Sequence, residues 1–167
     1  MKTSLIALFT IFLAVQASTN DILYQGGGDS TFYYDITGVG PCGPPNGIYT
    51  PFPENEGYAM CEWYNPNPKR LIEYGTNNIV AIPNGILRDN IRNYCGKRVI
   101  VTIDGVERSD IPLVVWDGCE ACNENGGLDF SSTMFAELFG ENRCVEGRIR
   151  GEMTFRIVDE QIIPLVG

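Results

Sequence analysis

Short apolar stretches that alternate with polar residues run through most of the chain and predict a mainly β protein. The stretches are rich in β-branched and aromatic residues, and clusters of glycine, proline, asparagine and aspartate separate them. They are TFYYDI (31–36), NIVAI (78–82), KRVIVTI (97–103), IPLVVW (111–116) and EMTFRIV (152–158). Asp104-Gly105 predicts a hairpin turn, and Asn46-Gly47, Asn84-Gly85 and Asn125-Gly126 predict further turns.

The pattern predicts one helix, which begins at Ser131 or Ser132 and ends at Gly140. Its apolar face carries Met134, Phe135, Leu138 and Phe139. A short helix between strands indicates a barrel with a covering helix.

A long irregular stretch between residues 43 and 77 predicts a large surface excursion within the same domain. It contains the sequence NPNPK and the aromatic residues Tyr58, Trp63 and Tyr64. Exposed aromatic side chains in a loop are suited to recognition of a polysaccharide or a protein.

The first 17 residues predict a secretory signal peptide, because Lys2 precedes the apolar run LIALFTIFLAV and the small residues that follow suit cleavage. The run is too short for a membrane span. We expect a secreted, extracellular protein whose residues 18–167 form a single domain.

Charge and composition restrict the partners. The full chain has a net charge of −9, and loss of Lys2 makes the remaining chain more acidic. Nucleic acid and anionic membranes are therefore poor partners, and acidic polysaccharides would be repelled unless a local patch reversed the field. The chain has no histidine, which excludes Ser-His and Cys-His nucleophile pairs and histidine-based zinc sites. We expect no metal, no cofactor and a monomer.

Six cysteines follow the predicted signal peptide, and an even number in a secreted chain indicates structural disulfides. They are Cys42, Cys61, Cys95, Cys119, Cys122 and Cys144. A metal or redox site at the Cys-x-x-Cys pair, Cys119 and Cys122, is the alternative. Oxidising export favours disulfides, and no second Cys-x-x-Cys completes a zinc ligand set.

The order of the motifs resembles a secreted six-stranded double-psi β-barrel over residues 26–158. TFYYD…GPCG, NIVAIP, CGKRVIVTIDG, VVWDGCEAC, GGLDFSSTMF and MTFRIV occur in this order. The chain is similar to rare lipoprotein A-like and barwin-like barrels and to the amino-terminal domain of expansins, and it is most similar to small fungal-type expansin-like proteins.

The resemblance also implies which residues form the site. Family 45 glycoside hydrolases carry a similar Thr-x-Tyr-x-Asp motif, matched here by Thr31, Tyr33 and Asp35, and its aspartate is their general base. Asp117 in WDGC and Asp129 in LDFS match two later aspartates of expansins. In a glycosidase Asp129 would be the acid, Asp35 the base, and Asp117 the neighbour that raises the acid's pKa.

Each candidate also has a structural interpretation. Asp35 precedes a glycine-rich turn and Asp117 lies beside Gly118, so either carboxylate can stabilise a turn. Asp129 lies just before the predicted helix and can interact with its amino terminus. Trp116 can stack on a sugar or pack in the core. Of Tyr33 and Tyr34, at most one lines a groove if the strand is regular.

The same resemblance implies a disulfide between Cys42 and Cys95. For the other four cysteines we favour Cys61–Cys119 with Cys122–Cys144 and keep Cys119–Cys122 with Cys61–Cys144 as the alternative.

Two functions from different classes remain open. The first is a non-hydrolytic cell-wall or effector module that binds an extracellular polysaccharide or a protein. The second is a glycan-cleaving enzyme, a family 45-like glycosidase or a lytic transglycosylase, that uses Asp129 with or without Asp35. We favour the first, because fold alone does not confer catalysis. Both predict Asp117 and Asp129 in one open groove beside Tyr33, with the pKa of Asp129 raised.

Overall fold

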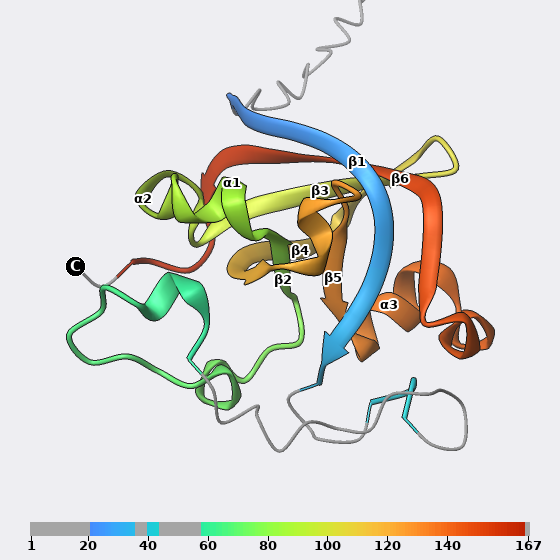
Figure 1. The fold of residues 1–167 in the computed structure, drawn as a ribbon, viewed down its shortest axis with the longest axis horizontal. Helices are drawn as coiled ribbons and strands as arrows, with labels where there is room; N and C mark the ends of the chain where they lie inside the picture. Colours follow the sequence, from blue (N-terminus) through green and yellow to red (C-terminus); the bar gives the residue numbers. More distant parts are fainter. Residues whose placement is uncertain (1–20, 36–39, 44–57, 166–167) are drawn as a thin grey trace, which may run out of the picture.

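A computed structural model describes residues 21–35, 40–43 and 58–165 of the chain. The predicted signal peptide and the predicted turn at Asn46-Gly47 lie outside the described residues. Six strands form a mixed sheet that closes into a barrel in the order β1-β5-β2-β4-β3-β6 (Figure 1). The strands are β1 (Ile22–Tyr34), β2 (Ile79–Pro83), β3 (Lys97–Ile103), β4 (Val106–Cys119), β5 (Leu128–Ser131) and β6 (Arg148–Gln161).

Short helices connect the strands. The α-helices are α1 (Asn84–Arg88), α2 (Ile91–Tyr94) and α3 (Ser132–Phe139), and the 3₁₀ helices are η1 (Met60–Glu62), η2 (Leu71–Tyr74), η3 (Ala121–Asn123) and η4 (Glu141–Glu146). The predicted helix is confirmed as α3, with Ser131 as its N-cap and Gly140 as its C-cap. The prediction of a single helix is wrong, since α1 and α2 are also present. Asn84-Gly85, predicted as a turn, forms the first turn of α1.

The hairpin between β3 and β4 is also confirmed. Asp104 and Gly105 have φ values of 51° and 77°, and positive φ at both central residues is typical of a two-residue turn that matches the twist of the strands. The five strand predictions all overlap observed strands. No strand signal predicted β5, which has only four residues.

The core of the barrel is built from the apolar faces of the strands, and all five residues of β2 are buried. The stretch before β2 is more than a surface excursion, because Met60, Cys61 and Leu71 are buried in the same core. The described residues include no helix that is long and apolar enough to cross a membrane.

All six cysteines form disulfides, as predicted, but the favoured pairing is wrong. The structure pairs Cys42 with Cys144, Cys61 with Cys95, and Cys119 with Cys122. Of the predicted pairs only Cys119–Cys122 occurs, and it came from the alternative set. The reason is spatial: a disulfide requires Cα atoms about 4.4–6.8 Å apart, and the fold brings η4 to Cys42 and η1 to Cys95.

A close backbone approach positions β5 beside β1. A Cβ atom on Gly28 would lie 2.0 Å from the Asn125 carbonyl oxygen, and one on Gly127 would lie 1.8 Å from the Asp29 carbonyl oxygen. Only glycine fits at such contacts. The loop before β5 can therefore lie directly on β1, and this contact places Asp129 next to Thr31.

Candidate functional site

Three of the predicted site residues lie in one row across adjacent strands. Asp129 on β5 pairs with Thr31 on β1 and with Ala81 on β2, and Ala81 in turn pairs with Asp117 on β4. Adjacent strands lie about 4.8 Å apart, so the two aspartate Cα atoms are separated by about 10 Å. We call Thr31, Asp129, Ala81 and Asp117 the carboxylate row.

Two β-bulges border the carboxylate row. Tyr33 is the extra residue where the β1–β5 register shifts, and Trp116 is the extra residue where the β2–β4 register shifts. A bulge changes the direction of a side chain and frequently occurs beside a functional site. The tyrosine hydroxyl donates a hydrogen bond of 3.3 Å to Asp117 Oδ2, so Tyr33 lies beside the row as predicted.

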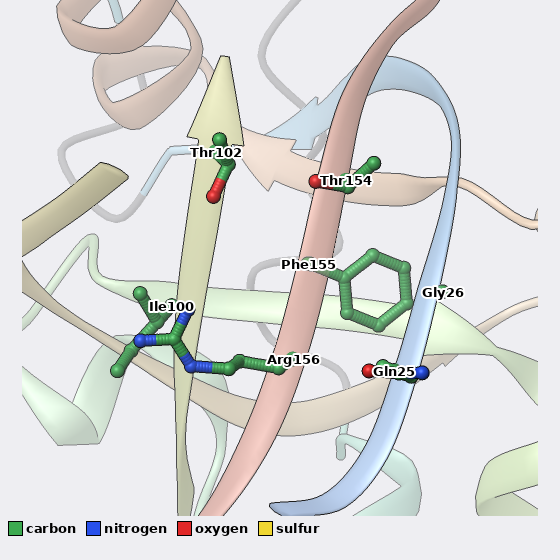
Figure 2. Close-up of a pocket in the computed structure, with 7 residues that line it drawn as sticks. All are labelled: Gln25, Gly26, Ile100, Thr102, Thr154, Phe155 and Arg156. Atoms are coloured by element: carbon green, nitrogen blue, oxygen red, sulfur yellow. The ribbon is translucent and has the colours of Figure 1, made fainter. Parts of the chain in front are cut away.

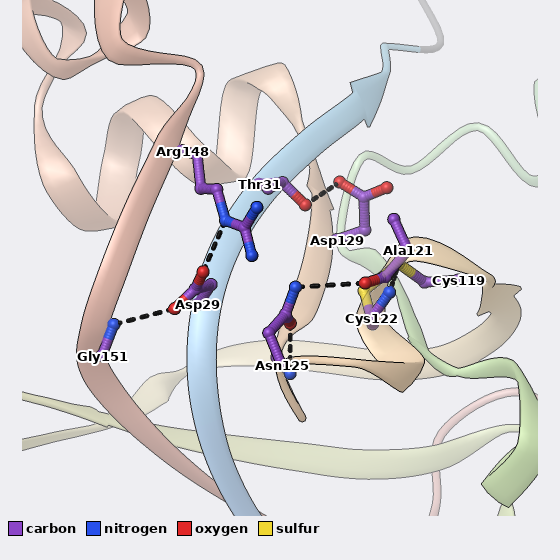
Figure 3. Close-up of polar contacts among 10 residues, drawn as sticks. Asp29, Thr31, Cys119, Ala121, Cys122, Asn125, Asp129, Arg148 and Gly151 are labelled. Carbon is purple, nitrogen blue, oxygen red and sulfur yellow. Dashed lines mark hydrogen bonds and ion pairs between the residues drawn. A yellow bond between two sulfur atoms is a disulfide. The ribbon is translucent and has the colours of Figure 1, made fainter.

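Asp129 is half-buried, and its environment disfavours the charged carboxylate. Burial, together with a smaller contribution from the negative charge of Asp117, raises its pKa to about 7 against the lowering effect of the Thr31 hydrogen bond. Thr31 Oγ1 donates that hydrogen bond to Asp129 Oδ1 over 2.7 Å (Figure 3). The prediction of a raised pKa agrees with this environment.

Asp117 is also half-buried, and desolvation raises its pKa. Three donors oppose that shift: the backbone N–H groups of Met60 and Gly118, each 2.8 Å from Oδ1, and the hydroxyl of Tyr33. No local sequence pattern indicates the Met60 contact, because it joins residues 57 positions apart. Two backbone N–H groups therefore hold the Asp117 carboxylate. Among the contacts that affect the pKa of Asp129, one hydrogen bond, from the Thr31 hydroxyl, stabilises its carboxylate.

The Cys119–Cys122 disulfide packs against Ala81 and Tyr33 next to the row. The backbone N–H of Cys122 donates to Cys119 Sγ, and the Asn125 amide donates to the Ala121 carbonyl (Figure 3). These contacts fix the loop that leads from Asp117 on β4 to Asp129 on β5. Both carboxylates are thus carried by constrained backbone, as a preorganised site requires.

Asp35 does not belong to this row. Its side chain is only 1% exposed and accepts hydrogen bonds from Ser132 Oγ, Asn77 Nδ2 and both the N–H and the hydroxyl of Thr133. The carboxylate is committed to the amino terminus of α3, which favours a negative charge. These contacts favour the structural interpretation of Asp35 over that of a general base.

Trp116 is 2% exposed, and its ring packs against Tyr74 with centroids 4.9 Å apart. Of the two interpretations of Trp116, this burial favours packing in the core over stacking on a sugar. Tyr58, Trp63 and Tyr64 are exposed, in agreement with the predicted aromatic surface.

A separate hollow of about 480 Å³ lies over β1, β3 and β6 (Figure 2). Its charged side chain, Arg156, forms an ion pair of 2.7 Å with Glu107. Phe155 lies against Gly26, where an added Cβ would come within 3.0 Å of the ring. This hollow does not include the carboxylate row, and the open groove predicted over Asp117 and Asp129 stays a prediction.

The row combines a carboxyl group that is protonated in part at neutral pH with a second carboxylate about two strands away. Such a pair can donate hydrogen bonds to hydroxyl groups and accept hydrogen bonds from them, and Asp129 can donate a proton. Among the described residues, no group of three or more histidine, cysteine, aspartate or glutamate side chains is arranged to hold a metal ion.

Comparison with protein-family models gave no match, and comparison with curated proteins gave none either. Among solved structures, the chain is similar to the Streptomyces papain inhibitor, with 26% sequence identity over 82% of this chain and 96% of the inhibitor chain. The TM-score of this match is 0.46. A likeness at this level carries no conclusion about function.

Proposed function

We propose that this protein is an extracellular, expansin-like double-psi barrel module that binds a polysaccharide without hydrolysing it. The closed six-stranded barrel supports the fold: β1–β5 and β2–β4 are parallel, and the other four neighbouring pairs are antiparallel. Thr31, Tyr33, Asp117 and Asp129 are the proposed contact residues.

The observation that carries the proposal is the separation of Asp35 from the carboxylate row. An inverting glycosidase needs a second carboxylate that activates water about 6.5–9.5 Å from the acid. Asp35 is 1% exposed and accepts four hydrogen bonds from α3 and Asn77, so its carboxylate has no access to a water on a bound sugar. The remaining carboxylates support recognition of hydroxyl groups.

The charge of the row favours an uncharged glycan. Asp117 and Asp129 are both half-buried, and at neutral pH a carboxylated sugar beside them would add like-charge repulsion in a partly desolvated site. Cellulose, chitin and neutral β-glucan are therefore the first ligands to test.

The test is a depletion assay with the purified protein on these three insoluble glycans, read at pH 6, with soluble sugars measured in parallel. We expect binding to at least one glycan, weakened about three- to tenfold in Asp129→Asn, and no released sugar. Glu124→Gln, an exposed acid-to-amide control in the loop before β5, should bind as the wild type does. Sugar release that depends on Asp35 would contradict the proposal.

The raised pKa of Asp129 favours one second candidate, a lytic transglycosylase, which needs a single catalytic acid. With a pKa of about 7, a substantial fraction of Asp129 carries a proton at neutral pH and could protonate a glycosidic oxygen. Mass spectrometry of peptidoglycan after incubation tests this candidate. Anhydro-sugar products that disappear in Asp129→Asn would establish it and replace the binding module.

A further inference from the structure

A second polar surface lies at α1 and α2, apart from the carboxylate row. A hollow of about 410 Å³ is lined by Tyr64, Arg88, Arg92 and Asn93, among others. A neighbouring hollow of about 290 Å³ shares Arg92 and Asn93 and extends to Lys97. The two hollows lie on either side of these shared residues, and we call the surface that they form together the arginine groove.

Arg88 and Arg92 give this groove an unusual charge. Other arginines of the barrel are neutralised by acids, as in the Arg98–Glu160, Arg143–Glu146 and Arg156–Glu107 ion pairs. Arg88 and Arg92 are exposed, and neither forms an ion pair with any residue in the described part of the chain.

Two acids also line the hollows. Asp159 is bound to Lys97 over 2.5 Å, and exposed Asp89 lies between the two arginines in sequence. With both acids counted, the groove keeps a positive charge in a chain whose net charge is −9. A patch that opposes the charge of the whole protein attracts an anion locally.

Aromatic surface adjoins the two arginines. Tyr64 is 76% exposed and lines the groove, and the next residue along the chain, Trp63, is 58% exposed. An exposed aromatic ring offers a flat apolar face at low entropic cost, and the amide of Asn93 adds hydrogen-bonding groups. The groove thus combines cations, a planar face and amide groups.

We propose that the arginine groove binds an anionic polysaccharide built from uronic acids. Arginine binds carboxylates through paired N–H donors, and a pyranose ring can lie on Tyr64. The positive charge of the groove, the exposed ring of Tyr64 and the amide of Asn93 together match a chain that carries carboxylates, pyranose rings and hydroxyl groups. The proposal does not depend on the carboxylate row.

The test is titration calorimetry of the purified protein with polygalacturonate, and with fully methyl-esterified polygalacturonate as the uncharged match. We expect binding to the free acid only, weakened by NaCl because the pairs are exposed. Arg88→Gln and Arg92→Gln should each weaken it about fivefold or more, and Tyr64→Leu about threefold. Arg150→Gln removes the same charge from an exposed arginine of β6 that lies outside the groove, and it should bind normally.

Several results would overturn the proposal. Equal binding of the methyl ester would show that the carboxylates are not recognised, and equal weakening by Arg150→Gln would show attraction by general charge. Equal binding of polyglutamate would show that the sugar ring is not recognised. Absence of binding in low salt by a protein with a normal thermal transition would also refute it. Asp129→Asn should leave polygalacturonate binding intact. This variant therefore distinguishes failure of the arginine-groove proposal from failure of the proposed neutral-glycan site.

Discussion

Opposing interactions act on the charge of the Asp129 carboxyl group. Its removal from water disfavours the charged form, and Asp117 adds repulsion, while one hydroxyl stabilises the carboxylate. Desolvation is the largest of these effects, so the pKa of Asp129 lies close to neutrality. The folded protein therefore holds this proton more tightly than the unfolded chain.

This linkage predicts how Asp129 affects stability. Its protonated form favours folding, so the contribution is complete below about pH 4 and is lost as the pH rises toward 7. The free energy of unfolding should fall by about 2–4 kcal/mol across that range from this group. Asp129→Asn should remove this dependence and match the wild type at pH 4 while exceeding it at pH 8.

Urea unfolding at a series of pH values measures the effect, with Glu124→Gln as the control that keeps the wild-type slope. An unchanged slope in Asp129→Asn would mean that the carboxyl is solvated in the folded protein.

The sequence permitted a partial prediction of these residues. The family resemblance identifies Thr31, Tyr33, Asp117 and Asp129, and the structure brings them together at adjacent strands. Asp35 was not separable from them, because its partners lie 42 to 98 positions away. A local sequence pattern cannot indicate contacts between residues so far apart in the chain.

At the scale of an element, α3 is the best-predicted part of the chain because its signals are local. The Ser131 hydroxyl accepts a hydrogen bond from the Met134 N–H, Gly140 ends the helix, and apolar residues recur on one face. Strand β5 shows the opposite case. Its four residues are too few for a periodic signal, and its position depends on pairing with β1 and β2.

The contacts of Asp35 at the start of α3 predict a structural phenotype. Asp35→Asn removes the negative charge and weakens acceptance from Thr133, so unfolding should require about 2–3 kcal/mol less. Urea denaturation measures the loss. Glu137→Gln, an exposed acid-to-amide change on the same helix, should cost less than about 0.5 kcal/mol. If the wild type released sugar, and Asp35→Asn lost that release with unaltered stability, Asp35 would be supported as a general base.

At the scale of the whole molecule, three disulfides span very different lengths of chain. Cys42–Cys144 joins residues 102 positions apart, Cys61–Cys95 joins residues 34 apart, and Cys119–Cys122 joins residues 3 apart. Three such bonds are typical of an exported protein. Their pairing could not be predicted from spacing alone, because it depends on where η1 and η4 meet the barrel.

The loop lengths predict an order of stabilisation. A cross-link restricts the unfolded chain more when the loop it closes is longer, so paired Cys→Ala substitution at Cys42–Cys144 should cost about 4–5 kcal/mol. The same substitution at Cys119–Cys122 should cost about 2 kcal/mol. Thermal unfolding of each double variant, with the other two disulfides verified by mass spectrometry, checks the order. The reverse order would mean that the short bond mainly maintains folded geometry.

Closure of the sheet has a consequence for how any protein partner can attach. Each of the six described strands has a hydrogen-bonded neighbour on both sides, so none of them is an edge strand. The registers of the described strands nevertheless leave two stretches paired on one side only: residues 22–28 of β1 pair with β6, and residues 106–113 of β4 pair with β3. An incoming peptide that adds itself as a further strand would do so at these stretches, where backbone groups face outward from the pairing. Elsewhere the closed ring pairs the strands on both sides, which limits edge-to-edge joining of folded copies to the same two stretches.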